Sequence, residues 1–234
     1  IEWPDAQTWA FEMDMARQSP DELFKEAVAM IDAGGSGSLA YAKRVLERLI
    51  SRNAQFDASY VELARVAMKT NWGPEGLHQA ENLLKSAQQI SPDSVNAKIL
   101  LGYVYAHQGR YAKAETLFME VAPGNPKNLW LWSNWGELLV MQGQAEAAIQ
   151  KYREALARPR TFDTYDRARL DAYEKLLALL EPRKDFDGIE AVHKQRVREY
   201  GKGSCYGAQY AKFMMIQSGD ESTAVELARL TMAS

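Results

Sequence analysis

The chain has 234 residues, of which 47% are hydrophobic and 25% charged, and its net charge is -3. This is the composition of an ordinary globular protein, too rich in Trp, Tyr and Leu for a disordered chain. Without an excess of Lys and Arg no nucleic-acid partner is expected, and without a run of about 18 apolar residues no part of the chain is expected to insert into a membrane.

Residues 1–18 are predicted to form a short helix that covers the first helical hairpin. They hold several large apolar side chains: Trp3, Trp9, Phe11, Met13 and Met15. The sequence SPDE at 19–22 then marks a helix start, with an N-cap Ser, a Pro at the first helical position and a Glu three residues after the cap. Two helices are predicted at 21–33 and 39–51, and the Gly-rich segment 34–37 between them is predicted to be a turn.

The second predicted hairpin has Ala64 on its first helix and Ala80 on its second. These residues are 16 positions apart, whereas the matching pairs of the next two hairpins are 12 apart. We therefore expect four extra residues in the turn at 71–76.

A repeat of 34 residues dominates the middle of the chain. Its members include Ala80, Ala114 and Ala148; Leu84, Phe118 and Tyr152; and Ala87, Val121 and Ala155. Ser91-Pro92 and Asn125-Pro126 are predicted to start helices, because proline fits the first helical turn. Gly109 and Gly143, also 34 apart, are predicted to end helices as C-terminal caps.

A fifth helix pair is predicted at 165–180 and 186–200. A degenerate last hairpin is indicated by Tyr206, Tyr210, Ala224 and Ala228. No run of alternating Val, Ile and Thr bounded by turns is present, so no strand is predicted. The sequence therefore predicts an all-α protein.

Two units in the middle carry a specific pattern. The first reads Leu101, Gly102, Tyr105, Gly109, Tyr111, Ala114, Phe118 and Pro126. The second reads Trp132, Trp135, Gly136, Leu139, Gly143, Ala148, Tyr152 and Ala155, with Arg160 in place of the closing proline. This pattern resembles the tetratricopeptide repeat family over roughly residues 95–162.

The resemblance implies an all-α, right-handed superhelical solenoid of about five to six antiparallel helix pairs. Residues 1–234 would form one solenoid domain, with the best-matched repeats at 95–162 and degenerate repeats on both sides. Small residues, Gly on the first helix and Ala on the second, would let the two backbones of a hairpin approach closely. The long turn at 71–76 also resembles Sel1-like repeats, which remain an alternative for that hairpin.

In proteins of this family the first helix of each pair lines the concave face. The register predicts a partner-binding face made by Arg65, Met68, Ile99, Tyr103, Trp130 and Glu137. The rings of Tyr103 and Trp130 would lie near one another, and aromatic side chains are common in binding hot spots. With Arg65 to one side, the expected ligand is a segment with an apolar centre and an acidic group.

Some family members hold acidic chaperone tails with a clamp of Lys, Asn and Arg on these helices. Here Val61 and Arg65 stand at the clamp positions of one unit, and Trp130 and Asn134 at those of another. The clamp is not matched, so chaperone tails are not expected as ligands.

No catalytic, cofactor-binding or metal-binding residue is expected. His78, His107 and His193 form no metal motif, and Cys205 has no neighbouring nucleophile signature. The segment GKGS at 201–204 lacks the preceding glycine and strand of a phosphate loop, so it is predicted to be a turn.

The expected function is that of a non-catalytic adaptor that binds a peptide or subunit on the concave face. The alternative is a scaffold or assembly subunit of a larger complex, such as a bacterial cell-envelope secretion or polysaccharide-export machine. An enzyme and an RNA-binding solenoid are less favoured by the residues present. Because the chain starts at Ile1 and not at Met, it is expected to be a trimmed or processed product, and both a cytoplasmic and a periplasmic location stay open.

Overall fold

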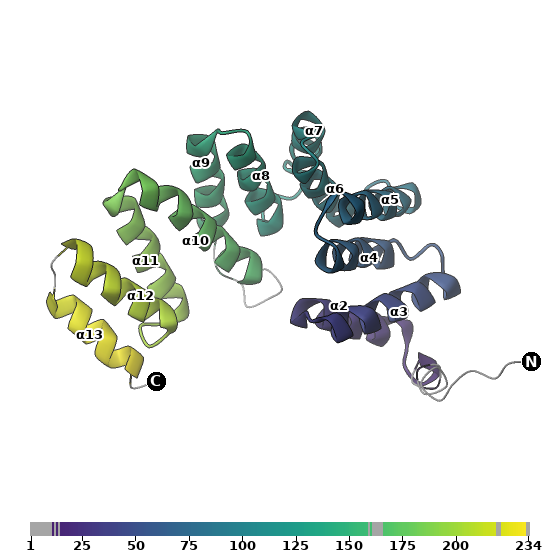
Figure 1. Ribbon diagram of the computed structural model, residues 1–234, viewed down its shortest axis with the longest axis horizontal. Helices are drawn as coiled ribbons and strands as arrows, with labels where there is room; N and C mark the ends of the chain where they lie inside the picture. Colours follow the sequence, from purple (N-terminus) through teal and green to yellow (C-terminus); the bar gives the residue numbers. More distant parts are fainter. Residues whose placement is uncertain are drawn as a thin grey trace, which may run out of the picture. The chain divides into compact units, whose positions relative to one another are not determined.

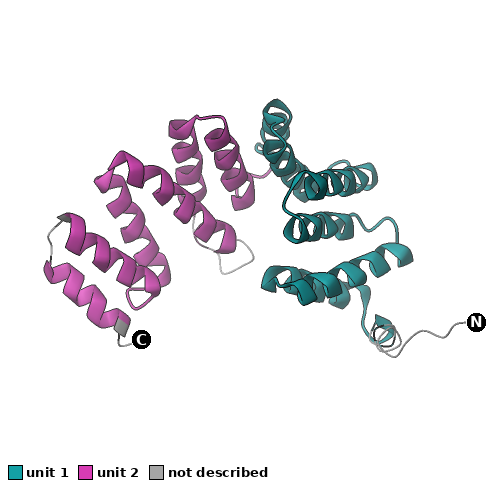
Figure 2. Cartoon of the chain, in the orientation of Figure 1, with its two compact units in different colours: residues 1–124 teal, residues 125–234 magenta. Residues whose placement is uncertain are grey.

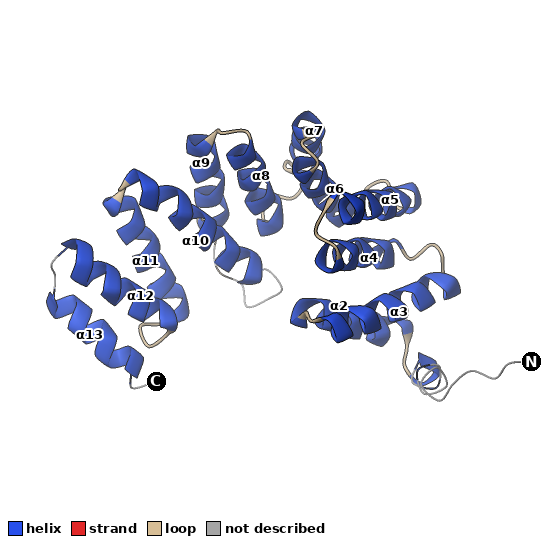
Figure 3. Cartoon of the chain, in the orientation of Figure 1, coloured by secondary structure: helices blue, strands red, loops and turns tan. Residues whose placement is uncertain are grey.

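The computed structural model describes residues 11, 13, 15–158, 160, 166–218 and 221–232. In this part of the chain all regular structure is helical (Figures 1 and 3). The helices are α2 (Pro20–Ala33), α3 (Ser36–Arg52), α4 (Asp57–Thr70), α5 (Pro74–Ile90), α6 (Val95–His107), α7 (Tyr111–Val121), α8 (Leu129–Met141), α9 (Ala145–Leu156), α10 (Asp166–Leu180), α11 (Phe186–Tyr200), α12 (Cys205–Phe213) and α13 (Glu221–Met232). A short 3-10 helix η1 (Glu181–Arg183) follows α10, and a π-helical turn η2 (Met214–Ser218) follows α12.

Consecutive helices pack in pairs, α2 with α3 through α12 with α13, which makes six pairs in the described residues. The predicted all-α repeat fold is thereby confirmed. The chain divides into two compact units, unit 1 (residues 1–124) and unit 2 (residues 125–234), shown in different colours in Figure 2. The single solenoid domain expected over 1–234 stays a prediction.

The first hairpin of unit 1 has its own apolar core, which includes Leu23, Ala27, Val45 and Leu46. From the N-terminal segment, Met15 is fully buried in this core and Phe11 packs against it. The Phe11 ring meets the Tyr41 ring edge-on, with the ring centroids 6.0 Å apart. Trp3 and Trp9, which were expected in the same covering helix, lie outside the described residues.

The predicted helix starts are right at one place and wrong at two. Ser19 caps α2 as expected: its hydroxyl accepts from the Glu22 N–H while the Glu22 carboxylate accepts from the Ser19 N–H. Ser91-Pro92 and Asn125-Pro126, however, form turns, and the helices begin three residues later, after Ser94 and Asn128. The Asn128 side chain accepts from the Leu131 N–H, so the true cap is the polar residue that follows the proline turn.

The predicted helix ends at Gly109 and Gly143 are confirmed, and both have φ of +74°. At the end of α6 the Gly109 N–H donates to Ala106 O at 3.0 Å and the Arg110 N–H donates to Tyr105 O at 2.8 Å. At the end of α8, Gly143 and the residue after it make the same two bonds. This pair of bonds is the Schellman motif, which needs a left-handed residue and therefore favours glycine.

The close helix approach predicted in the two best repeats is present, but its partner differs from the expectation. A Cβ on Gly102 would lie 2.6 Å from Cε1 of Phe118, and a Cβ on Gly136 would lie 2.6 Å from Cε1 of Tyr152. The glycines thus face the aromatic ring of the second helix, whereas the fully buried Ala114 lies one turn before that ring. The ring fills the space that the missing Cβ leaves.

The four extra residues of the second hairpin do not lengthen its turn, contrary to the prediction. Only 71–73 are non-helical, and α5 starts at Pro74, so three of the additional residues form an extra first turn of that helix and one lengthens the end of α4. Gly76 makes this turn possible, because a Cβ there would lie 1.8 Å from the carbonyl oxygen of Asn71.

A buried carboxylate links this extended helix to the next hairpin. Glu81 of α5 is almost fully buried, and its Oε1 lies 2.8 Å from Nη1 of Arg110 and 2.7 Å from Nζ of Lys85. Gln108 donates to its other oxygen at 3.1 Å. Burial by itself raises the pKa of Glu81, but these hydrogen bonds outweigh it and bring the pKa to about 2.

In unit 2 a second buried ion pair joins α10 to α11. Arg169 donates to both oxygens of Glu199, at 2.7 and 2.5 Å, and the Tyr173 hydroxyl donates to the same carboxylate at 2.8 Å. The bidentate, charge-assisted geometry holds α10 to α11. Nη1 of Arg169 and Nε of Arg196 are buried without a hydrogen-bond partner in the described residues.

Candidate functional site

The predicted partner-binding residues of unit 1 lie on two neighbouring first helices, α4 and α6. Met68 and Ile99 are only 6% and 4% exposed, so their side chains belong to the packing within unit 1 and offer little surface to a partner. Arg65 and Tyr103 are partly buried and reach the surface. Contacts of α4 with both α2 and α6 explain the burial, because side chains on this face also fill the space between first helices.

Arg65 is already engaged by two carboxylates. Its guanidinium lies 2.6 Å from Glu62 and 2.5 Å from Asp32 of α2. Burial lowers the pKa of Arg65, but the two acids outweigh it and the pKa is raised. Because Arg65 is already paired with two carboxylates, it is a poor partner for the acidic ligand group that the sequence suggested.

Tyr103 belongs to an aromatic cluster that also contains Trp72 and His107. The ring centroids are 4.4 Å apart for Tyr103 and His107, 4.8 Å for Trp72 and His107, and 6.1 Å for Trp72 and Tyr103. Trp72 lies in the turn between α4 and α5 and is 56% exposed. The aromatic cluster therefore presents a large apolar surface at the edge of unit 1.

In unit 2 the predicted residues Trp130 and Glu137 lie on α8. Trp130 is partly buried. Glu137 accepts from Lys175 of α10 at 2.5 Å, and Lys175 also pairs with Asp171 at 2.8 Å. Burial lowers the pKa of Lys175, but the two carboxylates outweigh it and the pKa is raised, so Lys175 stays charged and holds α8 to α10.

Tyr103 is part of unit 1 and Trp130 is part of unit 2. The expectation that their two rings adjoin stays a prediction. The rings that do contact Tyr103 are those of His107 and Trp72. The register of first helices could not reveal Trp72, because Trp72 lies in a turn. The sequence signal was the aromatic residue Trp72 just after the first helix of one hairpin. The first helix of the next hairpin carries Tyr103 at an inner position.

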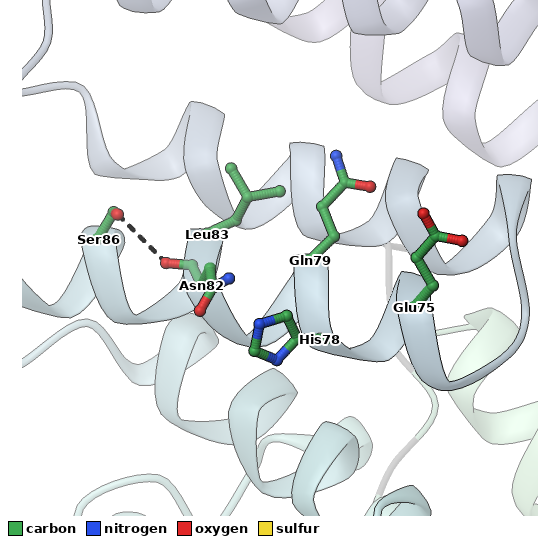
Figure 4. Close-up of a pocket in the computed structure, with 6 residues that line it drawn as sticks. All are labelled: Glu75, His78, Gln79, Asn82, Leu83 and Ser86. Carbon is green, nitrogen blue, oxygen red and sulfur yellow. Dashed lines mark hydrogen bonds between the residues drawn. The ribbon is translucent and has the colours of Figure 1, made fainter.

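A shallow hollow along α5 is shown in Figure 4, lined by Glu75, His78, Gln79, Asn82, Leu83 and Ser86. All six residues come from one helix. The Ser86 hydroxyl donates to the backbone oxygen of Asn82 at 3.2 Å. A single polar helix face of this kind encloses nothing, so we assign it no ligand.

Among the described residues, no group of three or more His, Cys, Asp or Glu side chains could hold a metal ion. Likewise, none of the described helices is both long and apolar enough to span a membrane. His78 and the free thiol of Cys205 are exposed, whereas His193 is buried.

The geometry defines a class of protein, an all-α repeat protein made of paired helices with surface-exposed aromatic and ionic groups. Residues 77–134 of the chain match the family model of the tetratricopeptide repeat. The resemblance to this family that the sequence indicated is thereby confirmed. No curated protein matches the chain.

Solved structures share the fold at low sequence identity. A thermophilic tetratricopeptide repeat protein of Thermus thermophilus, TTC0263, is 17% identical with a TM-score of 0.65, over 85% of this chain and 100% of that one. PilF of Pseudomonas aeruginosa is 13% identical with a TM-score of 0.61, over 89% and 88%. The Cut9–Hcn1 hetero-tetramer structure matches at 13% identity and a TM-score of 0.60, over 97% of this chain and 43% of that one.

These likenesses establish the fold. Tetratricopeptide repeats generally mediate protein–protein interaction, and proteins built from them are typically non-catalytic scaffolds.

Proposed function

We propose that this chain is a non-catalytic adaptor that holds a segment of another protein, and that the aromatic cluster of unit 1 is a principal contact. The exposed Trp72 is the observation that carries the proposal. Its ring packs against two other rings, so it can offer contact area to a partner with little further loss of side-chain freedom. Trp and Tyr are the residues most enriched among binding hot spots.

The charges on the same unit indicate what the bound segment carries. Arg65 is already paired with Glu62 and Asp32, so its charge is not available to an acidic group of a partner. A segment with an apolar side chain for the aromatic cluster suits this surface better than an acidic one.

The test compares matched variants of the purified chain in pull-downs quantified by mass spectrometry. Trp72→Ala should reduce the captured partner at least tenfold, while Met119→Ala, which removes an equally exposed apolar side chain from α7, should not. Equal capture by both variants would refute the aromatic cluster as the contact. If the wild type and Trp72→Ala capture the same multi-subunit complex in equal amounts, the scaffold alternative is favoured.

A further inference from the structure

We propose that unit 2 carries a second protein-binding site, a groove that takes one bulky apolar side chain from an extended, uncharged or charge-balanced segment of a partner protein. This site shares no residue with the aromatic cluster of unit 1 and goes beyond the function proposed above.

The groove lies among α10, η1, α11, α12 and η2 and has a volume of about 390 Å³. Its lining residues are Leu177, Glu181, Phe186, Ile189, His193, Gln209, Lys212, Phe213, Ile216 and Gln217. In contrast to the hollow on α5, several elements enclose it. Its volume falls at the lower end of the usual range for sites that bind small ligands.

The floor of the groove carries no charge. It includes Ile189 and His193, both more than nine-tenths buried, and the His193 ring lies 5.4 Å from that of Phe213. Burial, together with the nearby charge of Arg196, lowers the pKa of His193 to about 4, so the imidazole is neutral at pH 7. Its Nδ1 has no hydrogen-bond partner within the described chain, which leaves one polar atom in the floor unsatisfied.

The walls expose apolar side chains that the fold does not use. Phe186 at the start of α11 is 43% exposed and Ile216 on η2 is 64% exposed. Ile216 lies within the π-helical turn that interrupts the end of α12. Such π-helical turns are uncommon and occur often at functional sites, and this one places Ile216 at the groove.

The edge of the groove indicates the chemistry of the occupant. Glu181, Gln209, Lys212 and Gln217 line the edge, and none of their side chains makes a hydrogen bond or ion pair within the described residues. The two carboxamides can each donate to and accept from a peptide backbone. The one acid and the one base balance, so a strongly charged ligand finds no complement. An extended peptide with a bulky apolar residue uses both the floor and the edge.

The experiment uses a phage-displayed library of random nonapeptides, panned on the whole chain. We expect enriched peptides to share one bulky apolar residue. A fluorescein-labelled synthetic copy of the leading peptide is then titrated by fluorescence anisotropy. Ile216→Glu and Phe186→Glu, both at exposed positions, should each weaken binding at least tenfold, with circular dichroism showing intact helices. Met119→Glu in unit 1 is the matched control and should bind as the wild type does.

Other outcomes overturn the proposal. Peptide binding that is unchanged by both groove variants refutes it, as does a library that yields no enrichment. If Trp72→Ala loses peptide binding and Ile216→Glu keeps it, the peptide binds to the aromatic cluster. That result would refute the groove as the binding site and support the site proposed in unit 1. Sedimentation that shows a dimer abolished by Ile216→Glu would make a second copy the occupant.

Discussion

Gly136 and Tyr152 are in direct contact: a Cβ atom on Gly136 would lie 2.6 Å from Cε1 of the tyrosine ring. Gly136 is on α8 and Tyr152 is on α9, so this contact sets the distance between the two helices of the hairpin. Gly102 and Phe118 repeat the relationship one unit earlier.

Gly136→Leu should therefore overpack the hairpin and lower the free energy of unfolding by roughly 1–3 kcal/mol. Denaturant melts give the measurement. Combining it with Tyr152→Ala should cost less than the sum of the two single changes, because the ring that clashes is gone. If the loss of unfolding free energy in the double variant equals the sum of the losses from the two single changes, the two residues are not in contact.

A side chain added at Gly76, which contacts backbone, should cost more stability per added atom than one added at Gly136, which contacts a ring. Gly76→Ala places a Cβ against the Asn71 carbonyl oxygen, 1.8 Å away, and neither atom can turn aside as a side chain could. We expect a loss of stability above about 2 kcal/mol. Gly37→Ala on α3 is the matched control, since nothing lies within 4 Å of its Cβ, and it should not lower stability.

The Glu81 carboxylate should make stability fall in acid. Its pKa is about 2 in the folded chain against an ordinary value of 4.5, so the unfolded chain takes up the proton first. The stabilisation is complete above about pH 4.5 and is lost as the pH falls towards 2, to a total of about 3 kcal/mol. Chemical denaturation at a series of pH values should show that Glu81→Gln loses less unfolding free energy over this interval than the wild type. If the unfolding free energies of the two proteins fall in parallel with pH, the ion pair at Glu81 does not cause the acid sensitivity.

Trp130→Ala tests the part of the predicted binding face that lies in unit 2. Partner affinity should fall by about 2 kcal/mol or more while the thermal midpoint barely moves. Surface plasmon resonance with the captured partner and a thermal melt supply the two readings. Unfolding of the variant would show that Trp130 is a packing residue, and full affinity would place the ligand elsewhere.

The fold could be read from the sequence because its signals are local and repeated. The Ser19 capping box and the two C-terminal glycines each act within one hairpin, and the 34-residue step repeats the pattern of one hairpin in the next. The helix starts after Pro92 and Pro126 were misplaced by three residues, because each proline belongs to a turn that precedes its helix. The Ser94 N–H donates to Ser91 O and the Asn128 N–H donates to Asn125 O, which closes these turns.

The candidate site was less predictable because it depends on contacts between hairpins. Register alone put Met68 and Ile99 on the binding face, but neighbouring first helices bury both. Arg65 is engaged by Asp32, 33 residues earlier in the chain, so it is not available to a partner. Helix register does not include this contact. The role of Trp72 followed from a turn that no helical register includes, and the groove in unit 2 arises in repeats too degenerate for a pattern to align.

The paired hydrogen bonds that end α6 and α8 involve only main-chain atoms and one glycine each. The stop signal of such a hairpin is thus contained within the hairpin and requires nothing from the segment that follows. When such a stretch of chain is duplicated, each copy brings its internal turn with it, because every copy already ends its first helix and turns the chain into its second. Divergence of the remaining side chains is then free to give each copy its own surface.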